Sequence, residues 1–244
     1  MNKFHEMLLY FIRGVPMDRV VNLMGMKWYV PHDYVLPFVG RLTIPFGFLP
    51  LFEATQRNWI RQNVPKGGVF VDIGAAFGLY SHTFANHFDM VYAIEPHPVN
   101  RFILGENIRL NGLNNVQVIP YAVWDSHTEI RLGHLIENDY FRVGIQENQI
   151  EGIHTFDEVH IPTIRLDDVC LAPDFIKMDI EGGEYMAIRG MEETLSTYRP
   201  LLMVEVHEFQ HPAKDFFEIM GALGYRRIYS HWTSHVFAPD RRPQ

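Results

Sequence analysis

Acidic side chains follow a series of short apolar segments along this chain of 244 residues. They are Asp72, Glu95, Asp125, Asp179 and Glu205, with His207 two positions further on. If the apolar segments are parallel strands, their carboxyl ends meet at one edge of a sheet, where such sheets bind ligands. Carboxylates repel one another, so their gathering at one edge favours a ligand that is cationic or rich in hydroxyl groups.

A glycine turn accompanies the first of these acids, between an apolar strand at 69–73 and a helix that begins near Leu79. Gly74 permits a tight turn, and Gly78 lets the helix approach the ligand and the sheet closely. The spacing is Asp-x-Gly-x-x-x-Gly and lacks the G-x-G-x-x-G pattern, so a nicotinamide-dependent oxidoreductase is disfavoured. The turn resembles the S-adenosylmethionine loop of class I methyltransferases.

Glu95 ends the next apolar segment, 23 positions after Asp72 (95 − 72). An acid about 20 residues beyond a glycine turn is placed to accept hydrogen bonds from both hydroxyls of a ribose. Acids are also common at helix starts, which is the structural alternative for Glu95. Its pairing with the glycine turn favours the ribose-binding interpretation.

The composition is that of a globular protein, and it excludes several functional classes. Hydrophobic residues make up 47% and charged residues 20%, and the length suits one large α/β domain. The net charge of −8 argues against general nucleic-acid binding. Cys170 is the only cysteine, which excludes an intrachain disulfide and a cysteine-rich zinc site and agrees with a cytoplasmic location.

Residues 1–52 are expected to form an N-terminal extension that caps the substrate site or makes a subunit contact in a homodimer. The apolar run 7–12 is too short to span a membrane, and Arg13 interrupts it. A helix packed against the core is favoured over weak contact with a membrane surface.

Apolar strands and helical segments alternate over residues 53–244, which predicts one α/β domain. Strands are expected at 69–73, 90–94, 116–123, 175–179, 201–206, 225–229 and 234–238, and helices at 53–63, 79–87, 98–110, 184–198 and 213–223. The pattern predicts a Rossmann-like, mostly parallel seven-stranded sheet with helices on both faces and a closing C-terminal hairpin. Residues 125–165 break the pattern and are expected to form a hairpin insertion or a mobile flap.

The most distinctive segment after the glycine turn is Lys177-Met178-Asp179-Ile180-Glu181-Gly182-Gly183-Glu184. It closely resembles the K-x-D-x-E-G-x-E run of FkbM-type methyltransferases, although Gly183 stands where alanine is common. Further matching pieces at 71–75, 107–112, 166–168 and 205–207 follow in the right order, over roughly residues 53–210. The resemblance implies S-adenosylmethionine-dependent O-methylation of a hydroxyl on a sugar, glycan or natural product.

Within this interpretation the residues divide into base, acceptor and cofactor groups. Asp179 is the first candidate for the base that removes the hydroxyl proton, and His207 and Glu205 follow. Glu181 and Glu184 are expected to orient the acceptor, with a helix-start acid as the alternative for Glu184. The expected cofactor-binding residues are Asp72, Gly74, Ala75, Gly78, Tyr80, Ser81, Glu95, Pro96, Ala122, Trp124, Asp125 and Asp179; Trp124 would border the adenine, and Asp125 would accept from its amino group.

Three competing interpretations are weaker. The run from His207 to His211 matches the H-E-x-x-H motif of zinc proteases, but Pro212 interrupts the helix that this motif needs. A metal-assisted methyltransferase, with magnesium or a transition metal on Asp179, Glu205 and His207, stays open, although no dense aspartate cluster marks a site and no residue is assigned to a metal. A non-catalytic binding module is disfavoured because the glycines and Glu95 are retained.

Overall fold

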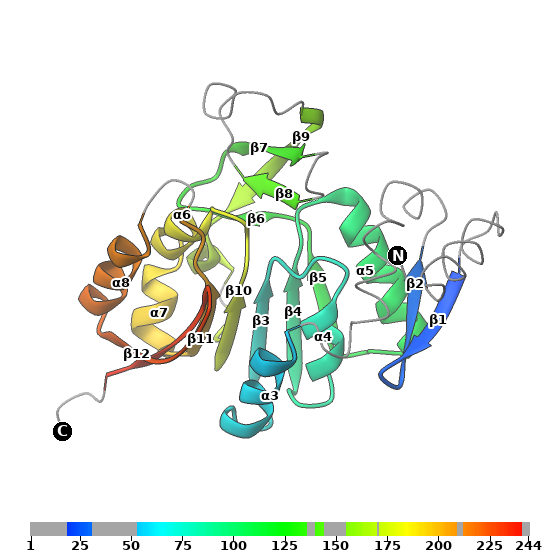
Figure 1. The fold of residues 1–244 in the computed structure, drawn as a ribbon, viewed down its shortest axis with the longest axis horizontal. Helices are drawn as coiled ribbons and strands as arrows, with labels where there is room; N and C mark the ends of the chain where they lie inside the picture. The colour runs from blue at the N-terminus through cyan, green and yellow to red at the C-terminus, as the bar shows by residue number, and fades with distance from the viewer. Residues whose placement is uncertain are drawn as a thin grey trace, which may run out of the picture.

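The computed structural model describes residues 19–30, 53–135, 140–143, 155–169, 171–208 and 212–240. Its centre is a seven-stranded sheet of order β12-β13-β11-β10-β3-β4-β5 (Figure 1). The strands are β3 (Val69–Ile73), β4 (Met90–Ile94), β5 (Val116–Ile119), β10 (Phe175–Met178), β11 (Leu201–Glu205), β12 (Tyr225–His231) and β13 (Ser234–Pro239). The first five run parallel, and β13 pairs antiparallel with β11 and β12. The mostly parallel sheet and its closing hairpin are as predicted.

Helices cover both faces of the sheet (Figure 1). They are α3 (Ala54–Asn63), α4 (Leu79–Phe84), α5 (Pro98–Asn111), α6 (Glu184–Arg189), α7 (Glu192–Tyr198) and α8 (Ala213–Ala222). Successive strand residues point to opposite faces. Phe70 and Phe175 therefore pack with α3 and α4, whereas Val71 and Ile176 pack with α6, α7 and α8. Strands buried on both faces explain the nearly continuous apolar runs in the sequence.

The single helix predicted at 184–198 is wrong, because Gly190 and Met191 separate α6 from α7. The chain passes very close to another backbone segment here: a Cβ on Gly190 would lie 1.8 Å from the carbonyl oxygen of Trp124. The new helix start is capped from a distance, since Asp167 Oδ1 accepts a hydrogen bond of 2.7 Å from Thr194 N. This capping aspartate belongs to the 3₁₀-helix η1 (Leu166–Asp168).

The segment after β5 forms a separate four-stranded sheet of order β6-β9-β7-β8. Its strands are β6 (Ala122–Val123), β7 (Glu129–Leu135), β8 (Tyr140–Val143) and β9 (Thr155–Ile164). The prediction that 122–123 continue the third strand of the central sheet is wrong, because β6 pairs in parallel with β9. In Figure 1 this small sheet projects beyond the upper end of the central strands. The insertion thus borders the edge at which the acids were expected.

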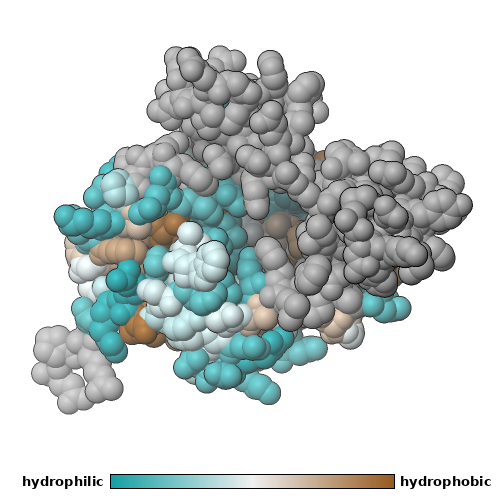
Figure 2. Space-filling model, in the orientation of Figure 1, coloured by the Kyte–Doolittle hydropathy of each residue, from teal (hydrophilic) through white to brown (hydrophobic). Residues whose placement is uncertain are grey.

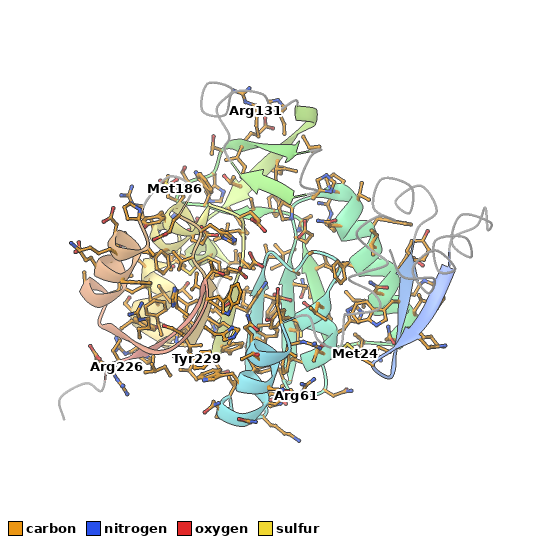
Figure 3. All side chains as sticks on the ribbon, in the orientation of Figure 1. Met24, Arg61, Arg131, Met186, Arg226 and Tyr229 are labelled. Carbon is orange, nitrogen blue, oxygen red and sulfur yellow. The ribbon has the colours of Figure 1, made fainter. Side chains whose placement is uncertain are left out.

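Part of the N-terminal extension is a hairpin of β1 (Arg19–Leu23) and β2 (Met26–Val30) that packs on α5. Tyr29 N donates a hydrogen bond of 2.6 Å to Asn107 Oδ1, and the Trp28 side chain is fully buried. Met24, labelled in Figure 3, has its sulfur 3.6 Å from Arg57 Nη1 of α3. The apolar run 7–12 lies outside the described residues. A cap or subunit contact by residues 1–52 stays a prediction.

The surface of the described part is mixed in polarity. On the face seen in Figure 2, its hydrophobic residues form small separate patches among hydrophilic ones. Within the described ranges, no helix is both long and apolar enough to cross a membrane.

The close approach at Gly190 generates a stability prediction. We expect Gly190→Ala to lower the free energy of unfolding by about 1–3 kcal/mol, because the added methyl group meets rigid backbone atoms. Gly105→Ala is the matched control: it lies within α5, and an added Cβ meets nothing within 4 Å. That change is expected to raise stability by about 0.5–1 kcal/mol. Urea denaturation of the three proteins measures both effects, and equal shifts would contradict the packing argument.

Candidate functional site

The glycine turn between β3 and α4 packs directly on the end of β10. Gly74 has φ +78°, and a Cβ on it would lie 1.9 Å from the carbonyl oxygen of Asp179. Gly78 has φ +100°, and its carbonyl oxygen accepts a hydrogen bond of 2.7 Å from His82 Nδ1. Side chains at these two positions would be strained and would collide with their neighbours. The turn is therefore restricted to glycine at the two positions that the sequence motif identified.

Asp72 is completely buried beneath this turn. Its Oδ2 accepts hydrogen bonds from Ser81 N (3.0 Å) and Ser81 Oγ (2.6 Å). Its Oδ1 is buried and has no hydrogen-bond partner within the described part of the chain. Burial raises the pKa of Asp72, while the charge of Lys177 and the hydrogen bonds from Ser81 oppose this rise. Asp72 and Ser81 thus brace the start of α4, and direct contact with a cofactor stays a prediction for both.

Glu95 lies at the end of β4 and fastens the glycine turn from the other side. Its Oε2 accepts a hydrogen bond of 2.8 Å from Ala76 N, and its Oε1 accepts one of 2.8 Å from His97 N. Burial raises the pKa of Glu95 to about 7. Each carboxylate oxygen has a second lone pair. Glu95 can therefore accept further hydrogen bonds from a vicinal diol that lies against the turn.

An apolar cavity lies beside Glu95, between the central sheet and the insertion. Its wall includes Gly74, Pro96, Ala122, Trp124 and Ile180. Four of these were predicted to bind a cofactor, so the fold brings them together at the turn. A flat aromatic base suits such a wall. Asp125 is absent from the lining, and its Oδ1 accepts a hydrogen bond of 2.8 Å from Ser126 Oγ.

Lys177 lies on the opposite side of the turn among four carboxyl groups. Its Nζ is 3.5 Å from Asp179 Oδ2 and 4.9 Å from the centre of the Tyr80 ring. Burial alone would lower the pKa of Lys177, but the charges of Asp179, Asp72, Glu53 and Glu205 raise it. Lys177 is thus a permanent buried cation. These distances are those of a strand lysine paired with a neighbouring acid.

Glu53 is a member of this cluster that the sequence interpretation missed. It precedes α3 and has a left-handed backbone conformation, with φ +49°. Burial raises its pKa to about 7, while Lys177 and a hydrogen bond with the Tyr80 hydroxyl oppose the rise. Its carboxylate, with those of Asp179 and Glu205, forms a group whose oxygens lie within 4.8 Å of one another. In the sequence, Glu53 was only the first residue of a predicted helix.

His207 contacts three acids, Glu181, Glu184 and Glu205, the last of which also belongs to the Lys177 cluster. Its Nδ1 is 3.0 Å from Glu184 Oε1, and its Nε2 is 3.4 Å from Glu181 Oε2 and 3.9 Å from Glu205 Oε1. Burial would lower the pKa of His207, but the hydrogen bond with Glu184 and the acidic charges raise it to about 9. The imidazole is therefore protonated at neutral pH.

Glu181 and Glu184 lie at different depths beside this imidazolium. The Glu184 side chain is fully buried, and its Oε1 also accepts a hydrogen bond of 3.1 Å from Gly182 N. The Glu181 side chain is 30% exposed, and burial raises its pKa to about 7. Glu181 is thus accessible to a bound molecule, whereas Glu184 contacts His207 on its buried side. Their predicted contact with the acceptor stays a prediction.

Two groups of side chains have the proximity that a metal ion requires. Ligand atoms of Asp179, Glu181 and His207 lie within 4.8 Å of one another, as do those of Glu53, Asp179 and Glu205. Oxygen ligands of this kind suit magnesium or manganese. Within the H-E-x-x-H match, His207 and Glu208 do not lie in a helix, Glu208 Oε1 accepts a hydrogen bond of 2.9 Å from Ala213 N, and His211 lies outside the described residues.

The sheet order, the glycine turn and the following acid are those of a class I S-adenosylmethionine-dependent methyltransferase, and solved structures agree in fold. An FkbM methyltransferase from Methylobacillus flagellatus KT is 20% identical, with a TM-score of 0.50, over 70% of this chain and 43% of its own. TYW2 of M. jannaschii, solved in complex with AdoMet, is 17% identical, with a TM-score of 0.50, over 93% of this chain and 88% of its own. An rRNA methylase from Streptococcus thermophilus is 11% identical, with a TM-score of 0.50, over 77% of this chain and 95% of its own.

The family is narrower than the fold. The model of the methyltransferase FkbM domain matches residues 72–227, so this chain belongs to the FkbM methyltransferase family. The predicted family, the enzyme class and the cofactor, S-adenosylmethionine, are thereby confirmed. No curated protein matches the chain significantly. The chain spans less than half the length of the FkbM structure it matches.

The protonated His207 gives a pH-dependent stability prediction. Its pKa is raised from an ordinary 6.5 to about 9, so its contribution is fully present below pH 6.5 and is lost as the pH rises through 9. The difference in unfolding free energy between wild type and His207→Gln should therefore shrink by roughly 3 kcal/mol between pH 6 and pH 9.5. Urea denaturation across this range measures the difference. Gly105→Ala, which removes no titratable group, should show no such trend.

Proposed function

We propose that this chain transfers the methyl group of S-adenosylmethionine to a hydroxyl oxygen of a sugar, glycan or natural-product acceptor. The observation that carries the proposal is the position of Asp179. Its backbone carbonyl packs against the Gly74 turn, while its carboxylate faces Lys177, Glu53 and Glu205. Asp179 therefore connects the glycine turn, which would bind the cofactor, with a group of carboxylates that could accept a proton.

The residues around the glycine turn have the chemistry that the cofactor needs. Glu95 would accept from the ribose hydroxyls, and the apolar wall of Pro96, Ala122 and Trp124 would border the adenine. Any side chain at Gly74 would collide with the backbone of Asp179 and displace the turn from it. When bound, S-adenosylmethionine supplies a methyl group that is electrophilic because it is attached to positively charged sulfur.

The remaining residues would hold the acceptor and take its proton. Asp179 Oδ1 is buried and has no hydrogen-bond partner among the described residues, so it can accept from an acceptor hydroxyl. Removal of that proton as the oxygen attacks is general-base catalysis. Glu205, whose pKa is raised by burial and by the charge of Asp179, is the second candidate base. His207 already carries a proton, so it would orient Glu181 and Glu205 instead of acting as the base.

A metal-assisted O-methyltransferase is the second candidate function. The proximity of Asp179, Glu181 and His207 favours it, since these atoms are close enough to share one cation. A metal ion there would replace the proton of His207 and would lower the pKa of the acceptor hydroxyl directly.

Calorimetric titration with S-adenosylhomocysteine tests the cofactor site. We expect micromolar-range binding, about −8 kcal/mol, and no binding of NAD. Glu95→Ala should abolish measurable binding of S-adenosylhomocysteine, because the ribose loses its acceptor and Ala76 N loses its partner. Glu192→Ala, at the start of α7, is the control and should bind like the wild type. Binding of NAD alone would overturn the assignment of the glycine turn.

Asp179→Asn tests the base. With a hydroxylated acceptor found by screening for release of S-adenosylhomocysteine, we expect turnover to fall by about 10²–10⁴-fold, because the amide cannot accept the proton. Binding of S-adenosylhomocysteine should remain measurable and weaken by no more than about 10-fold. Unchanged turnover would remove Asp179 as the base. The same assay in EDTA separates the two candidate functions: activity that is lost and is then restored by magnesium or manganese favours the metal-assisted reaction.

A further inference from the structure

The cluster on the β10 side of the glycine turn holds more negative than positive charge. Asp72, Asp179, Glu205 and Glu53 surround one lysine, Lys177, and each appears among the charges that raise its pKa. Two carboxylate oxygens, Asp72 Oδ1 and Asp179 Oδ1, are buried without a hydrogen-bond partner in the described ranges, and Asp72 is completely buried. Buried acceptors are normally satisfied. The cluster therefore has acceptor atoms that Lys177 does not satisfy, beside an excess of acids that favours a second cationic donor.

Its position fits one end of the cofactor. Strand order places β4, with Glu95, on one side of β3 and β10, with Asp179, on the other. A ligand whose ribose lies at Glu95 and which crosses the turn at Gly74 has its far end beside Asp179. The far end of S-adenosylmethionine is an amino acid, whose ammonium group has three N–H donors.

We propose that Glu53, together with Asp179, binds the α-ammonium group of the cofactor. Glu53 reaches the cluster from the segment before α3, and Tyr80 at the start of α4 holds its carboxylate through a hydrogen bond. The oxygens of Glu53 and Asp179 lie within 4.8 Å of each other, which allows one ammonium group to donate to both. The inference rests on the proposed cofactor site and adds a residue to it.

Calorimetry with two probes tests the inference without an acceptor. S-adenosylhomocysteine carries the amino-acid end, whereas 5′-methylthioadenosine has the same nucleoside and thioether without it. We expect Glu53→Gln to weaken binding of S-adenosylhomocysteine about 10-fold and to leave 5′-methylthioadenosine within about twofold, because a charged hydrogen bond is lost at the ammonium group alone. Glu192→Gln is the control for general charge and should change neither.

The ratio of the two affinities provides a readout that a structural role would not move. A general loss of structure weakens both probes and cancels in the ratio, whereas loss of the charged hydrogen bond at the ammonium group lowers the ratio about 10-fold. An unchanged ratio in Glu53→Gln, or equal weakening of both probes, would overturn the inference. Failure of the wild type to bind either probe would instead overturn the proposed cofactor site.

Discussion

The buried ammonium group of Lys177 stabilises the acidic residues that gather at the carboxyl ends of the central strands. Lys177 draws Asp72 from β3, Asp179 from the end of β10, Glu205 from β11 and Glu53 from the segment before α3 toward one point. Four carboxylates in a low-dielectric environment would repel one another and separate without it. Its own charge is secured by the same neighbours, since a buried lysine without acids would lose its proton. The cation and the acids are therefore mutually dependent, and removal of any one of them shifts the pKa of the others.

The site at this edge has two halves that differ in polarity and charge. On the β4 side, Glu95 accepts backbone N–H groups and borders an apolar cavity, which suits neutral hydroxyls and a flat base. The β10 and β11 side is highly charged, because it contains Lys177, His207 and their acidic partners. Such an environment suits proton transfer and the binding of cationic groups. The Gly74 turn lies between the halves, and its contact with the Asp179 carbonyl fixes their separation. A donor and an acceptor can thus meet at Asp179 while each keeps its own environment.

The sequence predicted what depends on local pattern and failed where long-range packing decides. The glycine turn, Glu95 and the strands follow from hydrophobic runs, glycine spacing and acids at strand ends, all of which are local signals. The break at Gly190 was missed because it results from contact with the Trp124 backbone, which lies far away in sequence. The pairing of 122–123 with β9 was missed for the same reason, since a two-residue strand has no pattern of its own.

Within the site, the sequence pattern does not show how deeply each acidic residue is buried. The acids were found by type and spacing, but Glu53 could not be distinguished from an ordinary helix-start acid, and the depth of Glu184 behind His207 leaves no mark in sequence. The backbone offers a signal that the sequence does not. Seven described residues other than glycine have positive φ, which is costly for residues with a Cβ, and Glu53, Ala76 and Glu181, all near +50°, are three of them. All three border the edge where the charged groups meet. Such strain persists only where surrounding contacts enforce it, and here those contacts are the carboxylate, imidazole and backbone bonds of the site itself.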